Sequence, residues 1–264
     1  MKMIHKSIEL RAGNPDIRMD TYIIDDPVGQ NRKRPLVVVC PGGGYSICSP
    51  TEAEPIALQF NAAGIHAVVV YYSVGVRYPE SLKDLSKAVE TVRAHADEWC
   101  VKEDKIVVCG FSAGAHLAGS LGVLWNKEPQ IKCENAENKP NGMILSYPVI
   151  TSGEKAHRGS FDVITGNDAE LLELTSLEKQ VSSDTPPAFI WHTFTDDCVP
   201  VENSLLMTQA MAEHKINTEL HIYPRGRHGL SLANPYAEGD DDETGTVPEV
   251  QNWIDMAVRW VKEL

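Results

Sequence analysis

Six short apolar runs that alternate with helical stretches constrain the fold of this chain more than any other feature of its sequence. Each run is rich in β-branched residues and nearly free of charge, which is typical of strands buried on both faces of a parallel sheet. The runs occupy residues 35–40, 65–72, 105–110, 142–148, 187–193 and 218–224. Helical patterns lie between most of them and suit right-handed crossovers. The sequence therefore predicts the α/β class: a doubly wound, mostly parallel sheet with helices on both faces.

The remaining elements are predicted from shorter patterns. Two alternating segments near the start, residues 3–10 and 19–25, are expected to pair antiparallel at one edge of the sheet. Thr51 and Glu54 have the spacing of a capping box, which predicts where the first long helix begins. The helical patterns cover residues 52–64, 81–100, 113–125, 201–214 and 247–264.

We expect one domain over residues 1–264, with an insertion at about 151–184. The insertion breaks the strand-helix rhythm, because two short helical pieces replace a single crossover helix. Open α/β sheets bind ligands at the carboxyl ends of their strands, so the insertion is predicted to be a cap over that edge. A surface loop without a role in binding is the alternative.

The charge balance disfavours two classes of partner. The chain carries 24 Lys and Arg against 37 Asp and Glu, a net charge of -13, and an acidic surface repels both nucleic acid and anionic membranes. The first residues interleave charged and apolar side chains, unlike a secretory signal, and no run approaches the roughly 18 apolar residues of a membrane span. We therefore expect a cytoplasmic protein that binds neither nucleic acid nor membrane.

Cofactor signals are weak throughout. The six cysteines contain no CxxC pair and lie mostly in apolar patterns, which predicts reduced core thiols. The acidic stretch 238–243 is interpreted as a solvated loop, with a cation site as the alternative. No nucleotide or flavin motif is present, so we expect no cofactor and no metal. The sequence leaves a homo-oligomer open.

The sequence Gly110-Phe111-Ser112-Ala113-Gly114 joins an apolar run to a helical pattern rich in small residues. In this strand-turn-helix context, GxSxG predicts a nucleophile elbow, in which the serine adopts a strained backbone conformation and the glycines avoid clashes. Ser112 is therefore the candidate nucleophile; a structural turn is the alternative.

A nucleophilic serine needs a histidine base and an orienting carboxylate, on loops that follow later strands. Of the nine histidines, His228 alone lies in a glycine-flanked loop directly after the last apolar run. His192 falls inside a strand pattern and is predicted to be structural. The acid comes from the loop after residues 187–193, where Asp196 and Asp197 are adjacent; we favour Asp196 and leave Asp197 open.

The same reaction needs two backbone N–H groups that stabilise the oxyanion. Ala113 follows the nucleophile and supplies one. The other is expected from Pro41-Gly42-Gly43-Gly44, which follows the run at 35–40. Consecutive glycines lose much backbone entropy on folding, so they indicate a backbone that approaches something closely. A plain turn is the alternative.

Four motifs, "PGGGY", "GFSAG", "TDDCVP" and "GRHGL", occur in an order and spacing that resemble the α/β-hydrolase superfamily over nearly the whole chain. They are similar to those of the small acetyl esterase and acetyl-xylan esterase-like branch. The resemblance implies Ser112 as nucleophile, His228 as base and Asp196 as acid, since the family's aspartate stands four residues before the proline. Related lipases carry histidine where this chain has Pro41, which leaves the second oxyanion donor open: Gly43 first, Gly44 second.

The resemblance also implies the substrate, a short-chain acyl ester of a sugar or xylo-oligosaccharide. A low aromatic content of 7% weakly favours short acyl chains. Tyr45, His157 and Phe161 are candidate substrate contacts. A serine peptidase of the same fold and a general short-chain carboxylesterase are the alternative functions.

Overall fold

One sheet organises the fold in this computed structural model, which describes residues 3–25, 29, 31–133, 135–235 and 245–264. Within these residues, nine strands form a sheet of order β1-β3-β5-β4-β6-β7-β8-β9, and β2 also pairs with β3. The strands are β1 (Met3–Ile4), β2 (Ser7–Glu9), β3 (Arg18–Ile24), β4 (Arg34–Cys40), β5 (His66–Tyr71), β6 (Val101–Phe111), β7 (Gly142–Ser146), β8 (Ala188–Thr193) and β9 (Thr218–Tyr223).

The pairing confirms both predictions about the sheet. The six apolar runs are the six strands β4 to β9, and every pair among them is parallel. Val38 of β4, for example, lies in register with Val68 of β5 and Val108 of β6. Residues 3–10 form two short strands, β1 and β2, and both pair antiparallel with β3 at the edge. The carboxyl ends of β4 to β9 therefore meet along one edge of the sheet.

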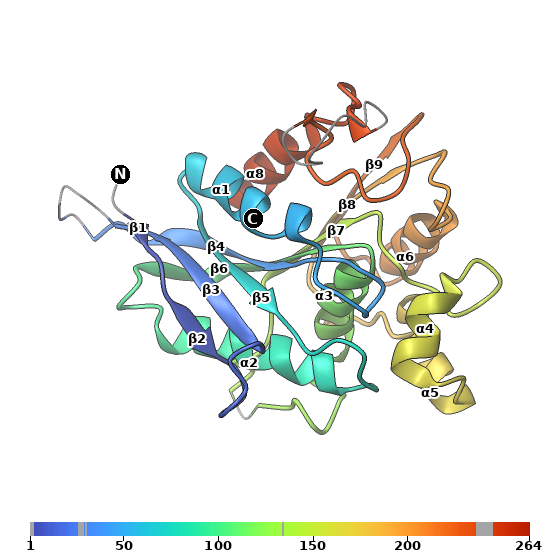
Figure 1. Cartoon of the computed structure of the whole chain (residues 1–264), viewed down its shortest axis with the longest axis horizontal. Coiled ribbons are helices and arrows are strands. Elements are labelled where there is room, and N and C mark those ends of the chain that lie inside the picture. Colours follow the sequence, from blue (N-terminus) through green and yellow to red (C-terminus); the bar gives the residue numbers. More distant parts are fainter. Residues whose placement is uncertain (1–2, 26–28, 30, 134, 236–244) are drawn as a thin grey trace.

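Helices cover both faces of the sheet, as predicted (Figure 1). They are α1 (Glu54–Ala62), α2 (Glu80–Ala94), α3 (Ala113–Leu124), α4 (Arg158–Thr165), α5 (Ala169–Leu174), α6 (Glu202–Glu213) and α8 (Trp253–Glu263), with the 3-10 turns η1 (Pro50–Glu52) and η2 (Leu177–Lys179). Phe60 of α1 and Trp253 of α8 belong to one core; Leu85 of α2, Leu117 of α3 and Met207 of α6 belong to the other. Each such side chain contributes about 1.5–3 kcal/mol through burial.

The capping box predicted at Thr51 is wrong. Thr51 lies inside η1, its hydroxyl pairs with Ser49 Oγ at 3.0 Å, and α1 begins at Glu54 with Ala53 at its N-cap and no side-chain cap. Pro50 begins the 3-10 turn η1, and Thr51 is the second residue of that turn. The N-cap position of α1 therefore falls at Ala53, two residues after Thr51. The turn instead points Glu52 inward, where its side chain is buried.

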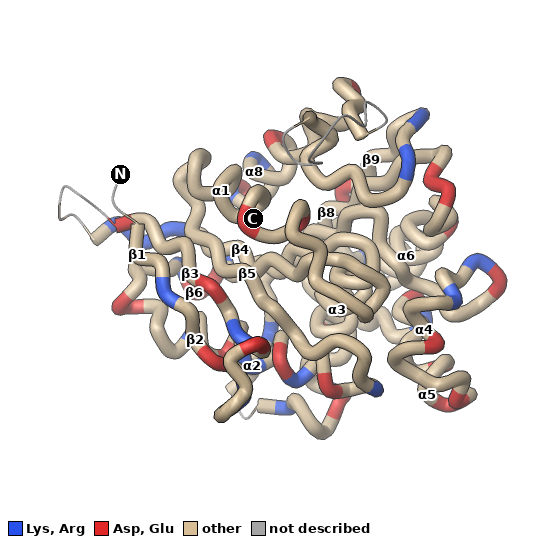
Figure 2. The backbone as a smooth tube through the Cα atoms, viewed as in Figure 1, with Lys and Arg blue, Asp and Glu red and all other residues tan. Residues whose placement is uncertain are grey.

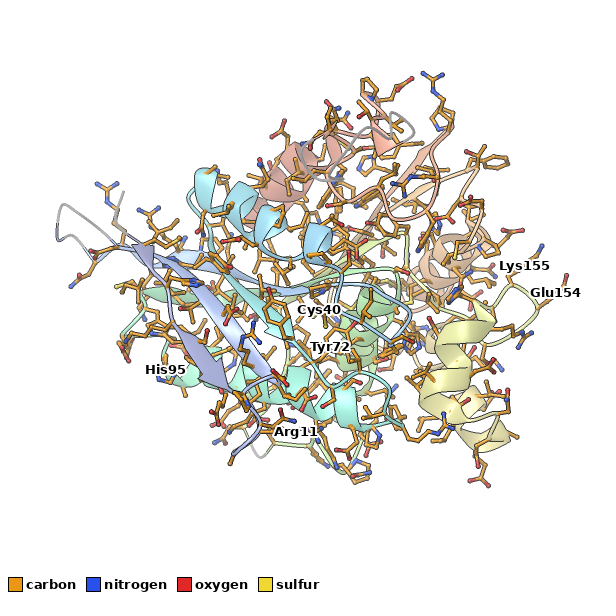
Figure 3. The ribbon with its side chains drawn as sticks, viewed as in Figure 1. Arg11, Cys40, Tyr72, His95, Glu154 and Lys155 are labelled. Atoms are coloured by element: carbon orange, nitrogen blue, oxygen red, sulfur yellow. The ribbon has the colours of Figure 1, made fainter. Side chains whose placement is uncertain are left out.

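The insertion lies between β7 and β8 and packs on α3. It contains α4, α5 and η2, and Leu177 of η2 is fully buried against α3. Glu154 and Lys155 project outward from the loop before α4 (Figure 3). The division of the chain into one domain with a cap at 151–184 stays a prediction.

Charged residues of both signs lie around the outside of the fold, as the composition leads us to expect. In Figure 2, Lys and Arg positions are interspersed with Asp and Glu positions around the periphery of the view. Among the described residues, no helix is long and apolar enough to cross a membrane. The prediction of core thiols is confirmed for Cys40 and Cys109, which are buried, while Cys198, in the loop after β8, is exposed. The other three cysteines, Cys48, Cys100 and Cys133, are partly buried. The acidic stretch 238–243 lies outside the described residues.

Candidate active site

Ser112 occupies the tight turn between β6 and α3. Its φ of 52° and ψ of −120° are unfavourable for a residue with a side chain, as expected at a nucleophile elbow. The flanking glycines are required by close packing: a Cβ on Gly114 would lie 2.2 Å from the carbonyl oxygen of Cys40, and one on Gly110 would lie 2.2 Å from that of Gly114. The serine is thereby held at the carboxyl edge of the sheet.

His228 and Asp196 lie next to this serine, on the loops that follow β9 and β8. His228 Nε2 is 2.8 Å from Ser112 Oγ, and His228 Nδ1 is 2.7 Å from Asp196 Oδ2. The Asp196 side chain is fully buried, and that of His228 is 18% exposed. The structure thus brings together the candidate nucleophile, base and orienting acid in one hydrogen-bonded chain, which has the geometry of a catalytic triad.

The two adjacent aspartates have different roles in this geometry. Asp196 Oδ1 accepts the backbone N–H groups of Cys198 and Val199, at 2.9 and 2.8 Å. Burial raises the pKa of Asp196, but hydrogen bonds from two histidines and from Val199, together with the charge of His228, lower it by more, so the pKa is well below its usual value. Asp196 is therefore ionised at neutral pH. Asp197 instead accepts the backbone N–H of His228 at 3.2 Å and does not reach the ring.

His192 is a second histidine on the same carboxylate, which sequence reasoning missed. Its Nε2 lies 3.2 Å from Asp196 Oδ2 and 3.0 Å from the carbonyl oxygen of Val199, and its Nδ1 lies 2.8 Å from Ser204 Oγ. A carbonyl can only accept, so this network assigns the proton to Nε2. The position of His192 inside a strand, four residues before Asp196, gave no signal of this contact.

The loop after β4 lies against the nucleophile. Gly43 and Gly44 have positive φ values of 123° and 64°, the region that favours glycine. Tyr72 anchors the start of the loop by donating its hydroxyl to the Pro41 carbonyl at 2.7 Å; Tyr72 and Cys40 are labelled in Figure 3. The Gly42 N–H is already committed to Glu52 Oε2, at 2.7 Å.

Of the N–H groups that the sequence offers for an oxyanion, three are left without an acceptor in the described part of the chain. Among the described residues, those of Gly43, Gly44 and Ala113 donate to no protein acceptor. This agrees with the donors expected from the sequence and excludes Gly42. Which of Gly43 and Gly44 faces the substrate carbonyl stays a prediction.

Two of the three predicted substrate contacts are corrected by burial. Tyr45 and Phe161 are 3% and 1% exposed, and both pack on His116: the Tyr45 hydroxyl lies 2.7 Å from His116 Nδ1, and the Phe161 ring lies edge-on at 5.4 Å. They are not available to a substrate because they fill the space between the loop after β4, α3 and α4.

His157 remains a candidate contact. It begins α4, is partly buried, and accepts hydrogen bonds from Ser160 at Nδ1. Burial lowers its pKa, and the charge of His228 lowers it further, while Asp196 raises it. These interactions place His157 within electrostatic range of His228 and Asp196.

His116 predicts a pH-dependent stability. It lies 2.8 Å from the Thr175 carbonyl through Nε2, and burial lowers its pKa to about 4. The unfolded chain, with a histidine pKa near 6.5, binds a proton between these values that the folded chain does not, so stability falls as pH drops. We expect a loss of up to about 3 kcal/mol between pH 6.5 and 4 from this residue.

Urea unfolding measured at several pH values will check this. His116→Leu should flatten the curve, and His66, whose burial also lowers its pKa to about 4, should account for much of the remaining slope. A His116→Leu curve parallel to that of the wild type over this range would contradict the assignment.

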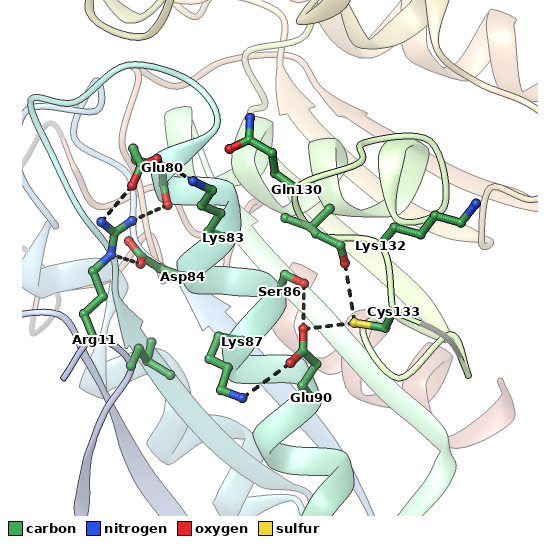
Figure 4. A pocket seen from close by; sticks show the side chains of 12 residues that line it. Arg11, Glu80, Lys83, Asp84, Ser86, Lys87, Glu90, Gln130, Lys132 and Cys133 are labelled. Carbon is green, nitrogen blue, oxygen red and sulfur yellow. Dashed lines mark hydrogen bonds and ion pairs between the residues drawn. The ribbon is translucent and has the colours of Figure 1, made fainter.

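A groove lies away from the triad, against α2 (Figure 4). Its volume is about 510 Å³, and no member of the triad lines it. Its charged groups neutralise one another in the ion pairs Arg11–Glu80, Arg11–Asp84, Lys83–Glu80 and Lys87–Glu90. Within the described part of the chain, no group of three or more His, Cys, Asp or Glu side chains is placed to hold a metal ion.

Known proteins are similar to this chain in sequence and in fold. The BD-FAE family model matches residues 19–211. The chain is 40% identical over 222 residues to endo-1,4-beta-xylanase B of Butyrivibrio fibrisolvens and 29% identical over 250 residues to an acetylxylan esterase of Xylanibacter ruminicola, covering 81% and 90% of this chain. It spans 34% and 48% of the length of these relatives.

One solved structure matches nearly the full length of both chains, unlike the two relatives above. The acetyl ester-xyloside bifunctional hydrolase of Caldicellulosiruptor lactoaceticus is 34% identical, with a TM-score of 0.85, and the match spans 98% of this chain and 96% of that one.

Proposed function

Because this chain belongs to the BD-FAE family of α/β-hydrolases, we propose that it is a serine esterase that hydrolyses short-chain acyl esters, acetyl esters first, of sugars or xylo-oligosaccharides. The observation that carries the proposal is the hydrogen-bonded chain from Ser112 through His228 to Asp196, with separations of 2.8 and 2.7 Å. A triad of this geometry activates a serine for acyl transfer.

The reaction begins when Ser112 Oγ attacks the ester carbonyl and its proton passes to His228 Nε2. Asp196 accepts the hydrogen bond from Nδ1, which holds the imidazole in the required tautomer and stabilises its cationic form. The N–H groups of Ala113 and of Gly43 or Gly44 stabilise the oxyanion. The sugar alcohol then leaves with the proton from His228.

The second half of the reaction regenerates the enzyme. His228 takes a proton from water, the resulting hydroxide attacks the acyl-serine, and the proton returns to Ser112 Oγ as the acid leaves. The buried, ionised Asp196 serves both halves equally because its hydrogen bonds to Cys198 and Val199 fix it independently of the substrate.

The sugar part of the substrate is supported by the relatives. One is named an acetylxylan esterase, and the Caldicellulosiruptor enzyme is named an acetyl ester-xyloside hydrolase. His157 is the side chain that we propose as a sugar contact, since its Nε2 is left to donate to a hydroxyl when Nδ1 accepts from Ser160.

Acetate release from an acetylated xylo-oligosaccharide, compared with hydrolysis of nitrophenyl esters of increasing acyl length, tests the proposal. We expect deacetylation of the sugar and a steep fall in rate beyond short acyl chains. Hydrolysis of aryl esters without sugar deacetylation would indicate a general carboxylesterase, and cleavage of an aminoacyl amide at a higher kcat/KM than any ester would indicate a peptidase. Either result would overturn the substrate assignment.

A further inference from the structure

Glu52 is a buried carboxylate that no step of the proposed mechanism uses. Its side chain is 3% exposed. Oε2 accepts the N–H of Gly42 at 2.7 Å, and Oε1 accepts the hydroxyl of Tyr147 at 2.6 Å. A buried carboxylate is costly unless hydrogen bonds satisfy both oxygens, so these contacts are strongly held in place.

On one side, this carboxylate orients the loop after β4. Gly42 lies directly against the nucleophile, since a Cβ on it would be 3.1 Å from Ser112 Cβ. Glu52 fixes its N–H, and the Ser49 N–H fixes its carbonyl at 3.0 Å. In a trans peptide the next N–H points opposite to this carbonyl. The direction of the Gly43 N–H, an oxyanion donor in our proposal, is therefore set by these two contacts.

On the other side, Glu52 reaches the loop that carries His228. The Tyr147 hydroxyl, which donates to Glu52, also accepts the backbone N–H of Ser231 at 2.9 Å, three residues after His228. The Tyr147 ring packs edge-on against the His228 ring at 5.1 Å. Ser231 Oγ in turn donates to the Thr51 carbonyl at 2.6 Å, which closes a ring of contacts beside Glu52.

We propose that Glu52 is a positioning residue that holds the oxyanion loop and the histidine loop in register on either side of Ser112. The inference rests on the proposed esterase function. Glu52 touches no reacting atom; it acts through the Gly42 N–H and through Tyr147. Its loss should misdirect the oxyanion donor, and misplacement of a catalytic group by a fraction of an ångström to an ångström costs about 10- to 100-fold in rate.

The test is Glu52→Gln, which keeps the shape of the side chain but offers one acceptor to two donors. We expect kcat per active site, titrated with an organophosphonate, to fall about 10- to 100-fold while KM changes less than about threefold. The affinity for an aryl trifluoromethyl ketone, whose serine adduct carries an oxyanion, should fall by the same factor as kcat.

Asp84→Asn is the matched control. Asp84 is likewise a buried carboxylate that accepts a backbone N–H, that of Ser73 at 2.8 Å, and a second donor, Arg11 at 2.5 Å. It should lower Tm and leave kcat per titrated site unchanged. Tyr147→Phe, which keeps the ring against His228, should lower kcat in the same direction, and the double variant should lose less than the product of the two single losses.

If Glu52→Gln lowers Tm but keeps kcat per titrated site and ketone affinity within twofold of the wild type, Glu52 is merely structural and the proposal is wrong. If Glu52→Gln does not fold, Tyr147→Phe becomes the test. Unchanged kcat and unchanged ketone affinity in Tyr147→Phe would then overturn the proposal. Failure of the proposed function is a separate outcome, because the wild type itself would then hydrolyse no ester. In that case the rate at which an organophosphonate labels Ser112 would still allow the variants to be compared with the wild type.

Discussion

Replacing Ser112 by alanine will lower kcat for ester hydrolysis by a factor of about 10⁴ to 10⁶, because no other group can form the acyl intermediate. Tm should change little, since among the described residues the hydroxyl has one hydrogen-bond partner, His228 Nε2. The measurement is initial rates with a short-chain nitrophenyl ester, together with loss of labelling by an organophosphonate.

Ser120→Ala provides the control for this variant. Ser120 is a buried serine of α3, the helix that follows Ser112, and its hydroxyl donates to the His116 carbonyl at 2.8 Å. It should retain full activity and full labelling. Ser112→Ala enzyme that keeps more than about 1% of wild-type activity would contradict the acyl-serine mechanism.

Asp196→Asn should lower kcat by about 10,000-fold with the fold intact. The amide can still accept the N–H groups of Cys198 and Val199, but its NH₂ then faces two imidazole nitrogens that now bond to Oδ2. His228 is driven to the tautomer with its proton on Nε2, which cannot take the proton of Ser112. Steady-state kinetics, with the fold checked by circular dichroism, measures the effect.

Asp197→Asn separates the two adjacent aspartates. Its amide can still accept the His228 backbone N–H, so the loss should not exceed about fivefold, the equivalent of one ordinary hydrogen bond. Equal losses in the two variants would show that Asp196 has no special role in orienting the imidazole.

The sequence predicts the sheet and the loops that carry Ser112, Asp196 and His228 because both depend on local patterns. Continuous apolar runs mark strands buried on both faces, and a glycine-flanked serine between such a strand and a helix marks the elbow. Parallel strands bring their carboxyl ends to one edge, so the loops holding Ser112, Asp196 and His228 had to meet there. Asp196 is favoured over Asp197 from its loop, the resemblance strengthens that choice, and the 2.7 Å contact with His228 Nδ1 supports it.

The supporting contacts could not be predicted, since they join residues far apart in the chain. Glu52 and Tyr147 are separated by 95 positions, and nothing near Glu52 distinguishes it from a solvated acid in a turn. The position of His192 inside an apolar run does not distinguish it from a structural histidine in a strand. Tyr45 and Phe161 were predicted as substrate contacts because their neighbours in sequence lie at the site, whereas their side chains turn into the core.

The burial of α3 restricts motion of the turn that carries Ser112. Every residue of this helix is buried, between the sheet on one side and α2 and the insertion on the other. Relaxing the strained backbone of Ser112 would require α3 to unpack from all of these neighbours, at a free energy close to that of global unfolding. The elbow is therefore preorganised in the free enzyme, and acylation needs no slow rearrangement at the serine before the ester arrives.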